Sequence, residues 1–180
     1  MHAPNYDDKP TTPKLISFVG RSNSGKTTLI TQLIPVFCRF GLRVGSIKHT
    51  HHDLTFDEPG KDSWKHRQAG SSRVLLLNNQ GMAMYSDPLP EYNINKLSKD
   101  YFSGFDLVFS EGFKNEKCLK VEVYRPENNK TPLYLDSGFE IQAVISNIQP
   151  NTKLPFLPID NHKIIVQWIC DHLKIEIETV

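Results

Sequence analysis

Residues 20–27 read Gly20-Arg21-Ser22-Asn23-Ser24-Gly25-Lys26-Thr27, and this stretch decides the fold. It matches the pattern GxxxxGK[ST], in which a loop bounded by glycines joins a buried strand to a helix and wraps phosphate oxygens with its backbone N–H groups. Both flanks fit, because an apolar run over 15–19 precedes the loop and apolar residues recur at helical spacing over 26–40. The stretch therefore predicts an α/β fold with a phosphate site where a strand meets a helix.

The polar residues of this loop have expected roles. Lys26 is placed to reach the β- and γ-phosphates of a nucleotide and to act in catalysis, and Thr27 to offer its hydroxyl to Mg²⁺. The residues expected to bind the nucleotide here are Ser22, Asn23, Ser24, Gly25, Lys26, Thr27 and Thr28. The motif by itself does not choose between GTP and ATP.

The segments around the loop predict the remaining architecture. A strand over 43–47 would complete a βαβ unit whose strands run parallel. Periodicity further along predicts helices over 62–68 and 94–102 and after Asn161, and strands over 73–77, 82–85, 106–109, 119–123, 141–145 and 156–159. We expect a P-loop NTPase-type three-layer sandwich, with a mostly parallel sheet plus an added β-hairpin or antiparallel strands.

Residues 119–123 alternate between apolar and polar side chains, which predicts a strand with one face in water. The edge of this strand and the hairpin over 73–85 would have to be covered or paired, because unpaired strand edges promote association. We expect one nucleotide-binding domain over 14–175, preceded by a flexible tail over 1–13.

Two residues after later strands are candidates for the same site. Glu111 follows the apolar run that begins at Asp106, which suits an acid that holds the metal or its water and takes part in catalysis; a solvated loop acid is the alternative. Asp106 itself begins the strand, too far from the phosphate end. The chain has no NKxD segment for guanine, but Asn147 follows the strand over 141–145 and is a candidate contact to a base edge, with Asp160 as a second.

Residues 48–53, Lys-His-Thr-His-His-Asp, follow the second expected strand. Ligands gather outside the carboxyl ends of parallel strands, so we expect this segment and the phosphate loop to be neighbours. His49, His51 and His52 suit a substrate phosphate, a partner or a transition metal, and Asp53 suits Mg²⁺; a plain polar surface loop is the alternative. Alternation in an extended segment would aim His49, His51 and Asp53 at the phosphate end.

The composition excludes several classes of protein. Lys plus Arg number 21 against 20 Asp plus Glu, so the net charge of +1 disfavours nucleic-acid binding. No apolar run approaches the ~18 residues of a membrane helix. The 3 cysteines form no CxxC pair, and this odd count suits small core-facing thiols in a reducing cytoplasm.

The motifs together resemble the molybdopterin-guanine dinucleotide biosynthesis adaptor family, protein B of that pathway. The resemblance covers residues 14–173 and rests on the loop at 20–28 and the segment at 47–53, then on Pro-Gly-Lys-Asp-Ser at 59–63, Gln-Ala-Gly at 68–70 and Glu-Gly-Phe-Lys at 111–114. It implies a GTP- and Mg²⁺-binding accessory protein with at most weak GTPase activity. It also implies a two-fold homodimer, which the strand edges above would join through a sheet-mediated contact. The expected partners are the enzyme that attaches GMP to molybdopterin, and the molybdopterin cofactor itself.

Two other functions remain open on the sequence. A small-molecule P-loop kinase would use arginines such as Arg67 and Arg73 from a mobile lid, although no clear lid is visible. A metal-delivery GTPase would use His49, His51 and His52 as nickel or zinc ligands.

Overall fold

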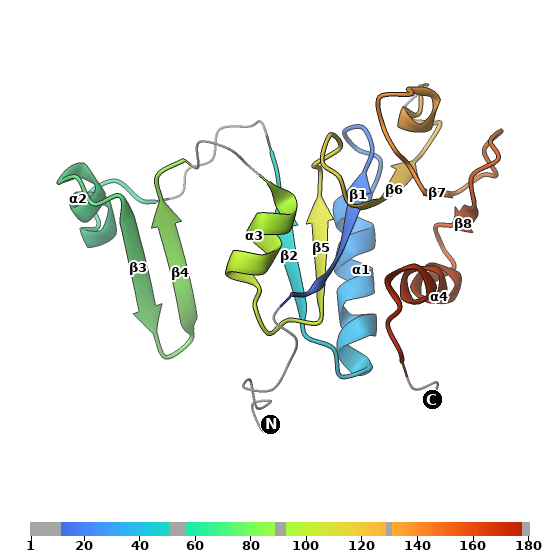
Figure 1. The fold of residues 1–180 in the computed structure, drawn as a ribbon. Coiled ribbons are helices and arrows are strands. Elements are labelled where there is room, and N and C mark those ends of the chain that lie inside the picture. Colours follow the sequence, from blue (N-terminus) through green and yellow to red (C-terminus); the bar gives the residue numbers. More distant parts are fainter. Residues whose placement is uncertain (1–11, 51–56, 89–92, 129–130, 178–180) are drawn as a thin grey trace. The chain divides into compact units, whose positions relative to one another are not determined.

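The computed structural model describes residues 12–50, 57–88, 93–128 and 131–177 (Figure 1). The chain forms two compact units, one from residues 1–49 and 93–180 and the other from residues 50–92. The first unit contains β1 (Lys14–Val19), α1 (Lys26–Arg39), β2 (Val44–Lys48), α3 (Ile94–Tyr101), β5 (Leu107–Glu111), β6 (Leu119–Tyr124), the 3-10 turn η1 (Leu133–Leu135), β7 (Ala143–Ser146), β8 (Phe156–Pro158) and α4 (His162–Leu173). Every helix and strand expected from the sequence is present, because each has a clear local periodicity.

The first unit is built on a parallel sheet with strand order β2-β5-β1-β6-β7-β8. This confirms the expected mostly parallel sheet. The two strands that precede the phosphate loop and the histidine segment, β1 and β2, are separated by β5. Glu111, at the end of β5, is in register with Phe18 of β1 and with Lys48 of β2. The end of β5 therefore links the two loops.

Helices α1 and α4 cover one face of the sheet with the main apolar core. Leu29, Leu33 and Phe37 recur on one side of α1 and are buried, and the Phe37 and Phe109 rings meet edge to face with centroids 5.5 Å apart. The last helix begins as expected, because the Asn161 side chain accepts a hydrogen bond from the N–H of Ile164.

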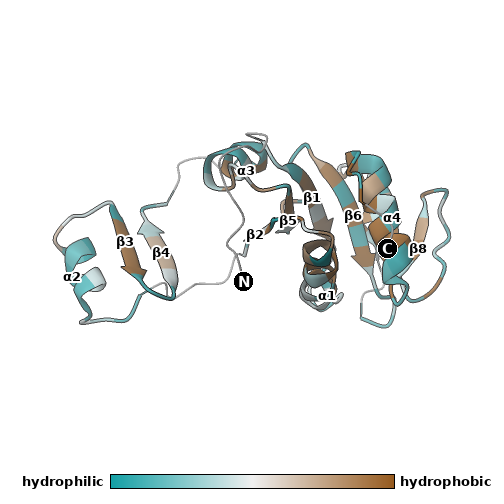
Figure 2. Cartoon of the chain, turned by 90° about the horizontal axis from the view of Figure 1, so that it is seen from below, coloured by the Kyte–Doolittle hydropathy of each residue, from teal (hydrophilic) through white to brown (hydrophobic). Residues whose placement is uncertain are grey.

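Helix α3 lies on the opposite side of the sheet from α1 (Figure 2). Its end approaches β2 closely, since a Cβ atom added to Gly45 would lie 2.3 Å from a ring carbon of Phe102. Position 45 therefore requires glycine, and its lack of a side chain lets the Phe102 ring pack directly against β2.

Strand β6 departs from the sequence expectation. Its polar residues are buried, with Lys120 3% and Glu122 1% exposed, so the strand has no face in water. The side chain of Lys120 donates to the carbonyl of Glu116, and Glu122 accepts from the backbone N–H groups of Leu133 and Tyr134. The alternation of apolar and polar residues in β6 therefore corresponds to two buried faces, one packed with apolar side chains and the other with hydrogen-bonded polar side chains. Because β6 lies between β1 and β7, it also offers no edge for the expected sheet-mediated dimer contact.

The second unit contains α2 (Asp62–Gln68) and a two-stranded antiparallel hairpin of β3 (Arg73–Asn78) and β4 (Gly81–Ser86). The turn is closed by the Asn78 side chain, which accepts from the N–H groups of Gln80 and Gly81. Strand β3 is coloured largely as hydrophobic in Figure 2, yet Leu77 is 69% exposed and its cross-strand partner Met82 is 68% exposed. The hairpin therefore presents apolar side chains that this unit does not cover.

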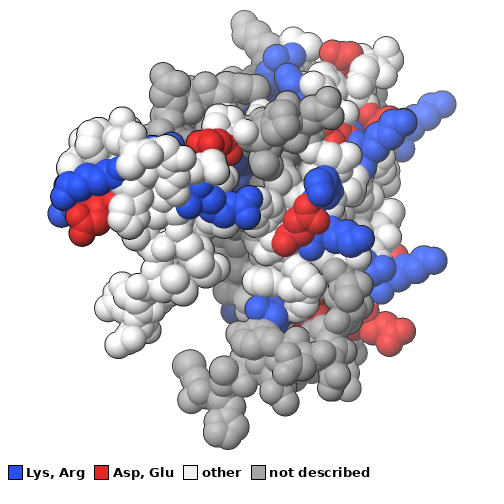
Figure 3. Space-filling model, turned by 60° about the vertical axis from the view of Figure 1, so that its left-hand side comes forward, with Lys and Arg blue, Asp and Glu red and all other residues white. Residues whose placement is uncertain are grey.

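The face drawn in Figure 3 carries both Lys or Arg side chains and Asp or Glu side chains, and some of them lie next to a residue of the opposite sign. Short ion pairs such as Lys65–Asp62 and Lys96–Asp100 join exposed residues one helical turn apart and contribute little to stability, because water and salt screen them. Within the part of the chain that the structure describes, no helix has the length and apolar character to cross a membrane.

The three cysteines do not share one environment. Cys170 is buried as expected and Cys118 is half-buried, but Cys38 is exposed on α1. The expectation of core-facing thiols is therefore wrong for Cys38, because that residue falls on the outer side of the helix.

Candidate functional site

The loop between β1 and α1 has the backbone of a phosphate cradle. Gly20 and Gly25 have φ values of 145° and 92°, a region that favours glycine. A Cβ atom on Gly20 would lie only 2.4 Å from the carbonyl oxygen of Val123, so no other residue fits against β6. Asn23 adopts a left-handed conformation with φ 61°, which asparagine tolerates better than most residues. The loop thus turns back over the first turn of α1, where free N–H groups favour an anion.

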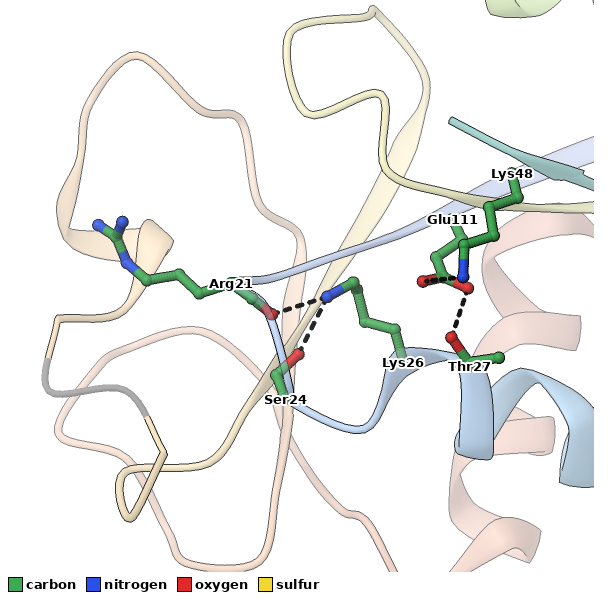
Figure 4. Close-up of polar contacts among 6 residues, drawn as sticks. All are labelled: Arg21, Ser24, Lys26, Thr27, Lys48 and Glu111. Carbon is green, nitrogen blue, oxygen red and sulfur yellow. Dashed lines mark hydrogen bonds and ion pairs between the residues drawn. The ribbon is translucent and has the colours of Figure 1, made fainter. Parts of the chain in front are cut away.

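Lys26 is held across the mouth of this loop (Figure 4). Its Nζ donates to the carbonyl of Arg21 at 2.7 Å and lies 3.4 Å from Oγ of Ser24. Burial lowers the pKa of Lys26; the Glu111 carboxylate opposes this, and the Lys48 ammonium adds to it. The ammonium is therefore partly desolvated and prepared to meet an anion.

Glu111 joins the phosphate loop to β2. Its Oε2 accepts a hydrogen bond of 2.8 Å from Oγ1 of Thr27, and its Oε1 lies 3.4 Å from Nζ of Lys48 (Figure 4). A hydroxyl and a carboxylate that face each other are the hard oxygen ligands that Mg²⁺ prefers, so these residues fit that ion. The sequence places Glu111 at the end of its strand, and the structure brings its carboxylate to the hydroxyl of Thr27.

Lys48 is a site residue that the sequence reasoning missed. Nothing local distinguishes it, because its contact with Glu111 depends on the pairing of β2 with β5. Its ammonium adds a second positive charge close to Lys26. The site therefore presents two cations and one carboxylate around the hydroxyl of Thr27.

The segment after β6 was also missed, and it holds the outer side of the phosphate loop. Nε of Arg21 donates to the carbonyl of Thr131 at 2.8 Å, and Nδ2 of Asn128 donates to the carbonyl of Asn23 at 2.9 Å. Nε of Arg125 lies 3.3 Å from the point that a Cβ atom of Gly25 would occupy. Polar residues follow most strands, so their presence after β6 in the sequence gave no signal that they would contact the phosphate loop.

Asn147 lies immediately after β7, at the same edge of the sheet as the phosphate loop. Its Nδ2 donates to Oε1 of Glu127 at 3.0 Å. Glu127 in turn lies 3.5 Å from NH1 of Arg125. The candidate base contact is therefore part of a polar group that includes a carboxylate and a guanidinium.

Of the histidine segment, His49 lies within the described residues, whereas His51, His52 and Asp53 lie outside them. The ring of His49 lies 5.1 Å from the ring of Phe113, and its backbone N–H donates to the carbonyl of Glu111. The segment thus starts beside the end of β5. Among the residues that the structure describes, no three His, Cys, Asp or Glu side chains group as a metal site would need.

The parallel sheet, the glycine-bounded loop and the carboxylate opposite Thr27 define a protein of the P-loop NTPase-type α/β class. The sequence pattern of the family described as "Molybdopterin guanine dinucleotide synthesis protein B" matches residues 15–147. The chain belongs to this family.

Individual relatives agree with this assignment. The Escherichia coli molybdopterin-guanine dinucleotide biosynthesis adapter protein is 34% identical over 162 residues, which span 86% of this chain and 93% of the relative. The Haemophilus influenzae protein of the same name is 39% identical over 117 residues, which span 64% of this chain and 66% of the relative. A crystal structure of molybdopterin-guanine biosynthesis protein B has a TM-score of 0.70 and 28% identity, and the match covers 89% of this chain and 99% of that one.

Proposed function

We propose that this chain is a GTP-binding adaptor in molybdenum cofactor maturation, which assists the formation of molybdopterin guanine dinucleotide. Family membership supports the pathway. The observation that carries the nucleotide role is the contact of Thr27 with Glu111 beside the half-buried Lys26. A hydroxyl, a carboxylate and an ammonium are grouped there as a magnesium–triphosphate would need them.

The proposed mechanism follows from these side chains. Lys26 leaves the carbonyl of Arg21 and donates to phosphate oxygens, and the N–H groups of residues 22–28 hold the remaining oxygens. Thr27 and Glu111 would hold Mg²⁺, which neutralises developing charge on the β- and γ-phosphates when it is bound. We assign any weak GTP hydrolysis to Lys26 and Glu111, and we propose that Asn147 contacts the base.

The histidine segment is the proposed contact with the pterin phosphate or the partner enzyme. His49 starts this segment next to Glu111, which supports a place beside the phosphate site. In this proposal His51 and His52 help position the anion, and Asp53 helps order Mg²⁺ and its waters. Changing His49 and His51 together to Ala should impair assistance to GMP transfer more than GTP binding. If the double variant supports cofactor maturation at the normal rate, the proposed role of the histidine segment is wrong and the segment is a polar surface loop without a ligand.

We propose a cytoplasmic homodimer in which each chain has one nucleotide-binding domain over 14–175. Of the two elements expected to form the dimer contact, the hairpin β3–β4 supports this proposal, because Leu77 and Met82 are exposed side by side on it. Covering these side chains and the strand edges would remove apolar surface from water.

The test of the main proposal is binding of GTP and ATP to the full chain with and without Mg²⁺, together with capture of the GMP-transferring enzyme. We expect GTP to bind, Mg²⁺ to strengthen binding, and the enzyme to be retained. Absence of nucleotide binding would overturn the proposal. Formation of ADP that depends on an added acceptor would favour a small-molecule kinase. Stoichiometric binding of nickel or zinc that disappears when the histidines of the segment are substituted would favour a metal-delivery GTPase.

A further inference from the structure

The segment after β6 is anchored to the phosphate-binding loop by one hydrogen bond and approaches the loop closely at a second residue. Asn128 donates to the carbonyl of Asn23 at 2.9 Å. Nε of Arg125 lies 3.3 Å from the point where a Cβ atom of Gly25 would be. Residues 125–128 therefore lie beside the phosphate-binding loop.

Glu127 lies between Arg125 and Asn128 in the chain and contacts the residue that follows the next strand. Nδ2 of Asn147 donates to its Oε1 at 3.0 Å, and NH1 of Arg125 lies 3.5 Å from the same oxygen. Strands β6 and β7 are paired through Tyr124 and Ser146, so the two segments leave the sheet next to each other. We call Arg125, Glu127 and Asn147 the edge cluster.

The edge cluster is accessible and carries a carboxylate. The side chain of Glu127 is 47% exposed. A hydrogen bond from its own backbone N–H, together with the amide of Asn147 and the guanidinium of Arg125, holds the pKa of the Glu127 carboxyl below its ordinary value. The group is therefore ionised at neutral pH, and an ionised carboxylate only accepts hydrogen bonds.

This donor and acceptor set complements one purine. Guanine presents N1–H and the 2-amino group side by side as donors, next to the acceptor O6. Adenine presents a bare N1 acceptor at the corresponding place, which a carboxylate repels. A carboxylate beside an amide N–H therefore matches the guanine edge and opposes the adenine edge.

We propose that Glu127 and Asn147 form the guanine-reading site of this chain, with Glu127 accepting from N1–H and the 2-amino group and Asn147 donating to O6. Arg125 is a positioning residue, which holds Glu127 against the phosphate loop. The hydrogen bond between Asn147 and Glu127 is exchanged for bonds to the base when a nucleotide enters. This inference rests on the proposed GTP-binding function, because it assigns the base contact of the same site.

The experiment measures binding of GTP, ITP, XTP and ATP by calorimetry at constant Mg²⁺, with tripolyphosphate as a probe that has no base. The variant is Glu127→Gln. The matched control is Glu140→Gln, which changes an exposed carboxylate that precedes β7 at the opposite edge of the sheet. Thermal unfolding of each variant checks that the fold is retained.

We expect the unchanged chain to bind GTP more tightly than ITP, which lacks the 2-amino group, and more tightly than XTP and ATP. Glu127→Gln should weaken GTP binding by roughly 10- to 100-fold, the loss expected for charge-assisted hydrogen bonds. It should also strengthen XTP binding, because the new amide N–H donates to the 2-oxo group of xanthine. Tripolyphosphate binding should not change, and Glu140→Gln should behave as the unchanged chain.

The other outcomes separate two failures. If the unchanged chain binds neither GTP nor tripolyphosphate, the nucleotide-binding function fails and the guanine site fails with it. If tripolyphosphate binds but GTP and ATP bind equally, or Glu127→Gln keeps the full preference for GTP, the guanine site is overturned and the phosphate site stands. An equal loss of tripolyphosphate and GTP would make Glu127 a support of the loop and would likewise overturn the inference.

Discussion

The hydroxyl of Thr27, in the first turn of α1, donates a 2.8 Å hydrogen bond to Oε2 of Glu111, the last residue of β5. This contact joins the helix that follows the phosphate loop to the neighbouring strand of the sheet. It places the proposed magnesium ligands opposite each other before any ion is bound. Glu111 is also the point at which Lys48 reaches the site from β2.

Glu111→Gln should separate the metal contribution from direct phosphate binding. The amide keeps an acceptor for Thr27 but loses the charge that favours Mg²⁺, so the gain in GTP affinity on adding Mg²⁺ should fall by about 10-fold. In EDTA, GTP affinity should stay the same or rise, because a carboxylate that repels phosphate is gone. Calorimetry under both conditions checks this, with Glu140→Gln as the control. An unchanged response to Mg²⁺ would remove Glu111 from the metal site.

Lys26→Ala should weaken GTP binding without loss of folding stability. Loss of a charge-assisted contact to phosphate should cost about 2–3 kcal/mol, or roughly 30- to 150-fold in affinity. Burial lowers the pKa of Lys26, so the free protein bears a desolvation cost that the variant removes. Calorimetry and thermal unfolding measure the two effects. The control is Lys14→Ala, at the exposed start of β1 and the opposite edge of the sheet. Equal GTP affinity in a folded Lys26 variant would exclude the phosphate assignment.

Charged substitutions on the hairpin should disrupt the proposed dimer. Leu77 and Met82 are paired across β3 and β4 and are more than two-thirds exposed, at 69% and 68%. Leu77→Lys and Met82→Lys would each place a charge in an interface formed there. The dimer of each variant should therefore dissociate into monomers at a higher protein concentration than the dimer of the unchanged chain. Light scattering over a concentration series measures this, with Gln80→Lys in the turn as the control. A monomer at tens of micromolar for the unchanged chain would contradict the dimer itself.

The buried carboxyl of Glu122 should titrate above its ordinary range. Burial raises its pKa, and the hydrogen bonds from the N–H groups of Leu133 and Tyr134 oppose the rise. A raised pKa means that the folded state binds the proton more tightly than the unfolded state. The free energy of unfolding contributed by Glu122 is therefore fully present below the unfolded pKa of about 4.3 and is lost as the pH rises through the folded pKa.

Two measurements check this expectation for Glu122. An NMR titration of the side-chain carboxyl should give a pKa above the ordinary value. The difference in unfolding free energy between the unchanged chain and Glu122→Gln should fall as the pH rises through that pKa. A carboxyl that titrates at or below the ordinary value would show that the two N–H donors outweigh burial.

The sequence by itself determined the local parts of this protein. The glycines of 20–27 and the apolar spacing on both sides fixed the strand, the loop and α1, because backbone freedom and helical periodicity are properties of neighbouring residues. The same local signals located Glu111 at the end of its strand and Asn161 at the start of α4. The hairpin turn at residues 78–81 was equally readable, because its side chains satisfy the turn's own backbone.

Only the tertiary structure decided which of these parts meet. Strand order and register arise from pairing between distant segments, so no local pattern could place β5 between β1 and β2 or bring Lys48 to Glu111. The same pairing placed β6 inside the sheet and buried Glu122, although the alternation of that strand suggested a wet face. It also set Glu127 beside Asn147, because the two residues follow strands that become neighbours only when the sheet forms.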